Sequence, residues 1–225
     1  MKKIPCLHVV TDDGILERQG ILGVMKTVYE TGGPDVAVHI RGPSTHGRKI
    51  HELVRKIRPI ADSTDGRLFL NDRLDIAWTA GADGVHLGQR SLPIRAVRRL
   101  VGRDLTIGAS VHNERESATA EKEGADYAFL GTLFMTPSHH GIEPGGVSLI
   151  SKMCPVIRDM PLVGIGGITP ERVGGVLAAG AKGVAVIRGV WDAGNPRDAV
   201  RAYLSELKLG EGEHNWAALS RFKFD

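Results

Sequence analysis

The stretches AGADGVHLG (residues 80–88), EGADYAFLG (123–131) and AGAKGVAVI (179–187) are near-copies of one pattern, and they decide the fold. Each begins with the small residues and glycine that end a helix, and continues through a short linker into a buried strand. A repeated helix-to-strand unit of this kind predicts strands that lie parallel in one sheet. We expect these three strands to be the fourth, sixth and eighth of the chain.

The remaining strands are expected in five other apolar runs, which alternate with amphipathic segments such as residues 16–30. These runs are Leu7–Val10, Val36–Ile40, Arg67–Leu70, LTIGAS (105–110) and LVGIGG (162–167). Eight strand and helix units in 225 residues predict an α/β protein with a single (β/α)8 TIM barrel. We place the barrel in residues 1–208 and treat residues 209–225 as a C-terminal appendage without an assigned role.

The composition is that of an ordinary globular protein, with 42% apolar residues, 24% charged residues and a net charge of +3. The arginines between Arg95 and Arg103 fit a solvated helix face better than a nucleic-acid site. No apolar run approaches the roughly 18 residues of a membrane span. Cys6 and Cys154 have no metal-binding spacing. We therefore expect a cytoplasmic protein without nucleic-acid or membrane partners; a homo-oligomer is left open.

The segment PLVGIGGITP (161–170) carries the signature of an anion site. Gly166 and Gly167 allow backbone N–H groups to approach a ligand, and Thr169 and Pro170 begin a helix whose N-terminus favours negative charge. Ile187 and its neighbours end the eighth strand, and barrels commonly bind phosphate after strands seven and eight. The sequence therefore predicts a phosphate site here, although a plain tight turn is the alternative.

Polar side chains follow the other predicted strands, whose ends meet at the barrel mouth. Arg41 has a planar guanidinium that suits a carboxylate or phosphate. Histidines are frequent at these ends and can move protons near neutral pH, although each also fits a structural role. Asp72 lacks a clear second carboxylate for a metal, so we favour a helix cap. The mouth candidates are Asp12, His39, Arg41, Asn71, Asp72, His86, Gln89, Ser110, His112, Thr132, Thr136, Ser138, His139 and His140.

Eight motifs occur in the order and spacing of a known superfamily: VVTDD, VHIR, LNDRLD, GADGVHLGQ, IGASVH, GADYAFLGTLFMTP, GIGGITPERV and GAKGVAVI. Over about residues 7–190 they resemble the thiamine phosphate synthase/TenI superfamily. The resemblance implies one of two activities. The synthase joins a pyrimidine diphosphate to a thiazole phosphate with magnesium, whereas the TenI branch aromatises a thiazole phosphate carboxylate by tautomerisation without a metal.

Departures from the synthase pattern favour the TenI branch. The synthase pattern that these motifs resemble has an aspartate at the position of Ser91. The same pattern has lysines at the positions of Pro43 and His139. These differences imply too little positive charge for a leaving diphosphate. The HIR motif that ends in Arg41 resembles the TenI branch. However, the TenI branch has a histidine after the sixth strand, and this chain has Thr132 at that position.

The leading hypothesis is therefore an isomerase, a TenI-like thiazole tautomerase of thiamine biosynthesis with no cofactor. His39 or His139 would move the proton, with His39 preferred because a strand end is more rigid than a loop. One alternative is a thiamine phosphate synthase that uses magnesium, and another is a non-catalytic sensor of a phosphate ligand. The implied contacts of the thiazole phosphate substrate are Arg41, Asn71, Thr136, Ser138, Gly166, Gly167, Ile187 and Arg188.

Overall fold

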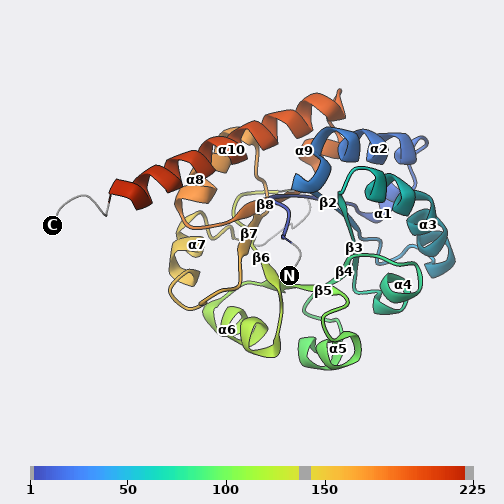
Figure 1. Ribbon diagram of the computed structural model, residues 1–225, viewed down its shortest axis with the longest axis horizontal. Coiled ribbons are helices and arrows are strands. Elements are labelled where there is room, and N and C mark those ends of the chain that lie inside the picture. The colour runs from blue at the N-terminus through green and yellow to red at the C-terminus, as the bar shows by residue number, and fades with distance from the viewer. Residues whose placement is uncertain (1–2, 137–142, 221–225) are drawn as a thin grey trace.

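The computed structural model describes residues 3–136 and 143–220, with the backbone alone described for residues 211–220. Eight parallel strands, paired in chain order, form a closed barrel, and β1 closes the barrel by pairing with β8. Helices surround the strands in a ring (Figure 1). The predicted (β/α)8 fold is therefore confirmed.

The strands lie close to the predicted positions. They are β1 (Leu7–Val10), β2 (Val36–Ile40), β3 (Arg67–Asn71), β4 (Gly84–Leu87), β5 (Thr106–Val111), β6 (Tyr127–Leu130), β7 (Leu162–Ile165) and β8 (Gly183–Val186). The helices are α1 (Asp13–Leu16), α2 (Ile21–Gly32), η1 (Gly33–Asp35), α3 (Gly47–Ser63), α4 (Leu74–Thr79), α5 (Ile94–Val101), α6 (Glu114–Glu123), α7 (Ser148–Met153), α8 (Pro170–Ala178), α9 (Arg188–Trp191) and α10 (Pro196–Ser220). The amphipathic segment expected at residues 16–30 is not one continuous helix: α1 ends at Leu16 and α2 begins at Ile21, because Gly20 takes a left-handed conformation, with φ 74°, between them.

Alternate strand residues fill the barrel interior. Val10, Phe69, Tyr127 and Phe129 belong to one buried apolar cluster there, and Ile4 packs against it from the start of the chain. A second and larger cluster lies between the strands and the surrounding helices. Because side chains fill the interior, a ligand has access to the ends of the barrel but not through it.

The three near-copies in the sequence share one backbone hydrogen bond. In each, the residue just before the new strand donates its N–H to a carbonyl near the start of the preceding strand. The bonds run from Asp83 to Leu68 (2.8 Å), from Asp126 to Ile107 (2.7 Å) and from Lys182 to Leu162 (2.7 Å). The repeated pattern therefore sets the register at the N-terminal ends of the strands.

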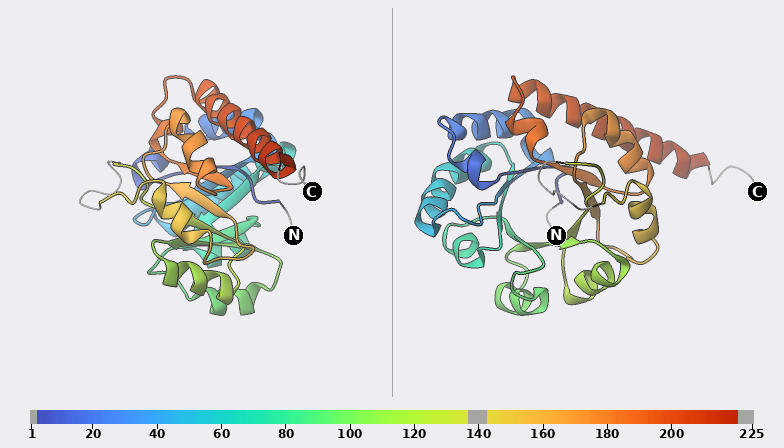
Figure 2. Two further views of the ribbon diagram at one scale, coloured as in Figure 1. Left: turned by 90° about the vertical axis from the view of Figure 1, so that its left-hand side faces the viewer. Right: turned by 180° about the vertical axis from the view of Figure 1, so that it is seen from behind.

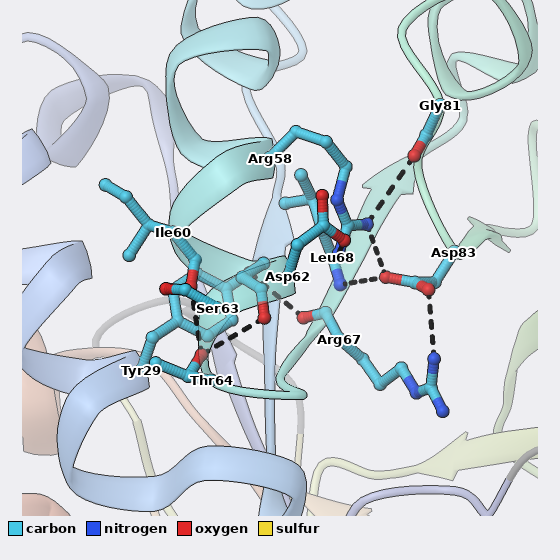
Figure 3. A network of polar contacts seen from close by, with 11 residues as sticks. Tyr29, Arg58, Ile60, Asp62, Ser63, Thr64, Arg67, Leu68, Gly81 and Asp83 are labelled. Carbon is cyan, nitrogen blue, oxygen red and sulfur yellow. Dashed lines mark hydrogen bonds and ion pairs between the residues drawn. The ribbon is translucent and has the colours of Figure 1, made fainter.

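Asp83 also organises a network of polar contacts at that end of the barrel (Figure 3). Its carboxylate accepts the Leu68 N–H at 2.9 Å and pairs with Arg58 at 2.6 Å and Arg67 at 3.1 Å. Burial works to raise the pKa of Asp83, but the Arg58 and Leu68 hydrogen bonds outweigh it, so the pKa is lowered. In barrel enzymes this end contributes stability and the opposite end carries the chemistry.

Helix α10 continues through the boundary that we placed between residues 208 and 209. It packs along α8 and α2, and it extends past the ring of helices (Figures 1 and 2). Gly210 lies so close to α8 that a Cβ atom there would stand 2.3 Å from Leu177. The first residues of the expected appendage are thus part of the helical ring. Within the described residues, no helix combines the length and apolarity needed to cross a membrane.

Candidate active site

Two adjoining cavities open at the C-terminal ends of the strands. The larger has a volume of about 600 Å³ and lies over β1–β6, and the smaller has about 420 Å³ and lies beside β7 and β8. They share the lining residues Thr132, Ile165, Ile187 and Arg188. The two cavities therefore adjoin at these four residues.

The smaller cavity is formed by the predicted phosphate loops. Gly166, Gly167 and Thr136 line it together with Ile187 and Arg188. Both glycines have positive φ, at 104° and 61°. Thr169 takes the N-cap position of α8 and Pro170 the first helical position, as predicted, but the Thr169 side chain makes no capping hydrogen bond. The first turn of α8 therefore leaves N–H groups without intrahelical partners beside this cavity.

The loop after β6 folds closely over these glycines. A Cβ atom on Gly166 would stand 2.7 Å from Thr132 Cγ2, and one on Gly167 would stand 2.4 Å from the Met135 carbonyl oxygen. Phe134 N–H donates to the Gly166 carbonyl at 3.0 Å. Only glycine at these positions permits such an approach, so the loops after β6, β7 and β8 enclose one small site.

The larger cavity is lined by more cationic than anionic side chains. Its described charged residues are Arg41, Arg73, Arg90 and Arg188 and the carboxylates Asp12 and Asp72. The expectation of too little positive charge for a diphosphate did not take these four arginines into account. It was based on missing lysines, whereas Arg73 and Arg90, which we did not nominate, come to the cavity from the loops after β3 and β4.

The four arginines differ in their partners. Arg188 bonds to Asp12 at 3.2 Å and Asp192 at 3.4 Å, and Arg73 is paired with Asp75 at 2.6 Å. The side chains of Arg41 and Arg90 have no hydrogen bond or ion pair with the described part of the chain. These two guanidinium groups are consequently available to a ligand.

Asp72 holds the loop after β4. It has a φ of 64°, its Oδ1 accepts the Gly88 N–H at 3.0 Å, and Ser91 Oγ donates to the same oxygen. The helix-cap expectation for Asp72 is wrong, because Arg73 occupies the N-cap position of α4. Among the described residues, no three side chains of histidine, cysteine, aspartate or glutamate come together as metal ligands.

His39 lies inside the barrel, not at its mouth. It is fully buried, its Nε2 stands 2.8 Å from His8 Nδ1, and its Nδ1 stands 3.3 Å from Asn71 Oδ1. Burial lowers the pKa of His39 well below its usual value, and the neighbouring His8 and His86 lower it further. His39 does not line the larger cavity, but its partner Asn71 does. His39 therefore lies below the cavity lining, although we expected it at the mouth.

His86 is also buried, at the base of the larger cavity. Its Nε2 stands 2.9 Å from Ser110 Oγ and its Nδ1 stands 3.3 Å from the Tyr127 hydroxyl. Burial lowers the pKa of His86 to about 3, so the ring is neutral near pH 7. His8, which we did not nominate, belongs to the same group of buried histidines. The sequence does contain a signal for the burial of His8. Side chains alternate between the two faces of a strand, so His8 and Val10 of β1 both point into the barrel.

The remaining candidates divide between the cavity rim and undescribed positions. Gln89 donates to the Ser110 carbonyl at 2.6 Å, and His112 Nδ1 pairs with Glu116 at 3.0 Å; both side chains lie on the rim of the larger cavity. Ser138, His139 and His140 lie outside the described residues, so their predicted roles stay predictions.

A third cavity, of about 1190 Å³, lies at the opposite end of the barrel. Its lining includes Arg58, Asp83 and Asp126, which are engaged in the ion pairs of that end. Because these charged groups are satisfied within the chain, the greater volume of this cavity does not make it the better candidate for a ligand site.

Comparison with known proteins identifies the family of this chain. Residues 7–190 match the family model described as thiamine monophosphate synthase. The thiamine-phosphate synthase of Chlorobium luteolum is 37% identical over 212 residues, which cover 92% of this chain and 97% of that protein. The bifunctional ThiM/ThiE protein of Symbiobacterium thermophilum is 43% identical over 163 residues, 72% of this chain but only 34% of that protein.

Among solved structures, thiamine phosphate pyrophosphorylase from Pyrococcus furiosus superimposes with a TM-score of 0.79 at 30% identity, covering 91% of this chain and 96% of that one. These similarities overturn the tautomerase hypothesis and its isomerase class, because the relatives are named as synthases. The proton transfer that we assigned to His39 or His139 was part of that hypothesis. The synthase alternative is the one that the comparisons favour.

Proposed function

Because the chain belongs to the thiamine monophosphate synthase family, we propose that it is a transferase that joins a pyrimidine diphosphate to a thiazole phosphate. The products would be thiamine phosphate and diphosphate. The observation that supports this most directly is the pair of adjoining cavities, one lined by glycine loops and the other by arginines. Each cavity matches one phosphorylated reactant.

The thiazole phosphate is proposed to bind in the smaller cavity. Its phosphate would accept hydrogen bonds from the backbone N–H groups of the loops at Gly166, Gly167 and Ile187, beside the N-terminus of α8. Arg188 lines both cavities and is already oriented by Asp12. The ring would then extend past Thr132 and Ile165 toward the larger cavity.

The pyrimidine diphosphate is proposed to bind in the larger cavity. The guanidinium groups of Arg41 and Arg90 can each donate two hydrogen bonds to phosphate oxygens. Asn71 and Ser110 offer neutral polar groups deeper in the cavity. His39 and His86 hold these two side chains from below, at the distances given above. We assign both histidines a positioning role.

The proposed reaction substitutes one bond for another at the pyrimidine methylene carbon. The carbon–oxygen bond to the diphosphate breaks, and both electrons leave with the diphosphate. The thiazole nitrogen supplies the electron pair of the new carbon–nitrogen bond. No proton has to be removed in this step, which agrees with histidines that are buried and neutral. The arginines stabilise the charge that develops on the leaving group.

The family resemblance implies magnesium for this reaction, but the donor set of the chain does not fit a carboxylate-held ion. Magnesium in such sites is bound through one or two carboxylates together with substrate phosphates. Asp72 has one oxygen committed to Gly88 and Ser91, and Asp12 is paired with Arg188. We therefore assign stabilisation of the leaving diphosphate to the arginines.

The test is to incubate the purified chain with both reactants and measure thiamine phosphate by its oxidation to fluorescent thiochrome, and diphosphate by ³¹P NMR. Equimolar formation of the two products supports the proposal, and omission of the thiazole phosphate is the control. Binding of both reactants without product would contradict it and match a sensor instead. Arg41→Ala is expected to abolish most of the activity, whereas Arg99→Ala on the exposed face of α5 is not.

A further inference from the structure

The loop that joins β4 to α5 carries an arginine where it faces the larger cavity. Gly88, Gln89, Arg90 and Ser91 follow β4 in sequence, and the first three line that cavity. Ser91 Oγ donates to Asp72 and accepts the Gly88 N–H at 2.8 Å. The base of the loop is therefore fixed to the end of β3.

Both neighbours of Arg90 are fixed by hydrogen bonds. Gln89 Nε2 donates to the Ser110 carbonyl at 2.6 Å and to Glu116 at 3.1 Å, while Ser91 is bonded to Asp72. Arg90 between them has no partner within residues 3–136 and 143–210, where side chains are described. Its backbone is thus preorganised while its guanidinium stays available, a combination that favours binding of a ligand.

The same loop disfavours a metal ion held by the protein. A second carboxylate next to Asp72 is absent from this loop because residue 91 is a serine, and its hydroxyl occupies one of the Asp72 oxygens. Arg73 is also beside Asp72, but its guanidinium is paired with Asp75. The guanidinium groups of Arg41 and Arg90 in the same cavity, which are unpaired within the described chain, disfavour a cation and attract an anion.

We infer that this chain binds diphosphate through Arg90 and Arg41 in place of a carboxylate-held magnesium ion, so that its affinity for diphosphate does not require a divalent metal. This inference rests on the proposed function only for the identity of the natural ligand. The positive charge that a metal would supply to the leaving diphosphate comes from a loop that the chain itself holds in position.

The test is calorimetric titration of the full chain with inorganic pyrophosphate, in EDTA and in magnesium. The wild-type affinity in EDTA is expected to lie within about threefold of that in magnesium. Arg90→Gln is expected to weaken binding in EDTA by about tenfold or more, since two charge-assisted hydrogen bonds are lost. Arg99→Gln, in the exposed part of α5 and outside the cavity, is the matched control and should change the affinity less than twofold.

Ser91→Asp supplies the missing carboxylate beside Asp72, and this variant is expected to bind pyrophosphate at least fivefold more tightly in magnesium than in EDTA. Wild-type binding that is lost in EDTA, or equal effects of Arg90→Gln and Arg99→Gln, would overturn the inference. If thiamine phosphate forms but pyrophosphate binding requires magnesium, this inference fails and the proposed function stands. If pyrophosphate binds in EDTA through Arg90 but no thiamine phosphate forms, the proposed function fails and this inference stands.

Discussion

Gly167→Ala should damage the phosphate site without touching the larger cavity. Gly167 has a φ of 61°, a left-handed conformation that costs a residue with a Cβ atom about 1–2 kcal/mol. The added methyl would also stand 2.4 Å from the Met135 carbonyl oxygen and 3.0 Å from Phe134 Cβ. Such contacts are too short to persist, so the loop after β6 has to move away from the loop after β7.

The expected loss of affinity for the phosphate depends on how many of its hydrogen bonds this movement breaks. If the phosphate loses one hydrogen bond from a backbone N–H, the cost is about 1.5–3 kcal/mol, because the acceptor is charged. That corresponds to a rise of about tenfold to a hundredfold in the KM for thiazole phosphate. The KM for the pyrimidine diphosphate is expected to change less than twofold, since Gly167 does not line the larger cavity.

Gly174→Ala is the matched control. Gly174 lies within α8, and apart from its chain neighbours and the backbone of its own helix, a Cβ atom there would meet nothing within 4 Å. Alanine at this position is expected to stabilise the helix by about 0.5–1 kcal/mol and to leave both KM values unchanged. Steady-state kinetics with each substrate varied, together with thermal unfolding, separates the two variants. An equal rise in both KM values for Gly167→Ala, or no rise in either, would refute the assignment of this cavity to the thiazole phosphate.

Three further predictions concern charge. Asp83→Asn is expected to lower the free energy of unfolding by about 3 kcal/mol at pH 7 in urea titrations, because it breaks a buried ion pair; since the folded pKa of Asp83 is lowered, the difference should shrink as pH falls below about 4. His8, His39 and His86 have folded pKa values lowered by burial, so the unfolded chain takes up protons first. Stability should therefore decline as pH falls from about 6.5, by up to about 1.4 kcal/mol per pH unit for each histidine, and a flat urea stability profile between pH 7 and 5 would contradict their burial as neutral groups. Arg41→Lys is expected to raise the KM for the pyrimidine diphosphate about tenfold, because an ammonium cannot reproduce bidentate binding, and kinetics indistinguishable from wild type would argue against direct contact.

The architecture could be predicted from the sequence because it depends on local patterns. The near-copies contain a helix end, a turn and a strand within nine residues, and the structure shows that each also contains the backbone bond that sets the register. The phosphate loops could be placed for the same reason. Gly166, Gly167 and Thr169 carry their conformational preferences in the residues themselves.

The larger cavity could not be predicted as well, because its properties depend on contacts between distant residues. Asp72 resembles a helix cap in sequence, yet its carboxylate bonds to Ser91, 19 positions away. His39 lies near a strand end, but its burial depends on which face of β2 points inward and on His8 from another strand. The lysines missing from the motifs can be read from single positions of the sequence. Arg90 lies at none of those positions and enters the same cavity from another loop.

The two ends of the barrel use the same residue types in opposite ways. At the N-terminal end, Arg58 and Arg98 pair with Asp83 and Asp126, and those aspartates also bind the backbone of the preceding strand. At the C-terminal end, Arg90 is fixed through its neighbours but its guanidinium is left without a partner in the described chain. A charge that the chain satisfies itself stabilises the fold, whereas a charge that the chain positions but does not satisfy can bind a ligand. The structural arginines have ion-pair partners within the folded chain, whereas the arginines proposed to hold the diphosphate have none in its described part. This difference separates the two groups better than residue type or motif position does.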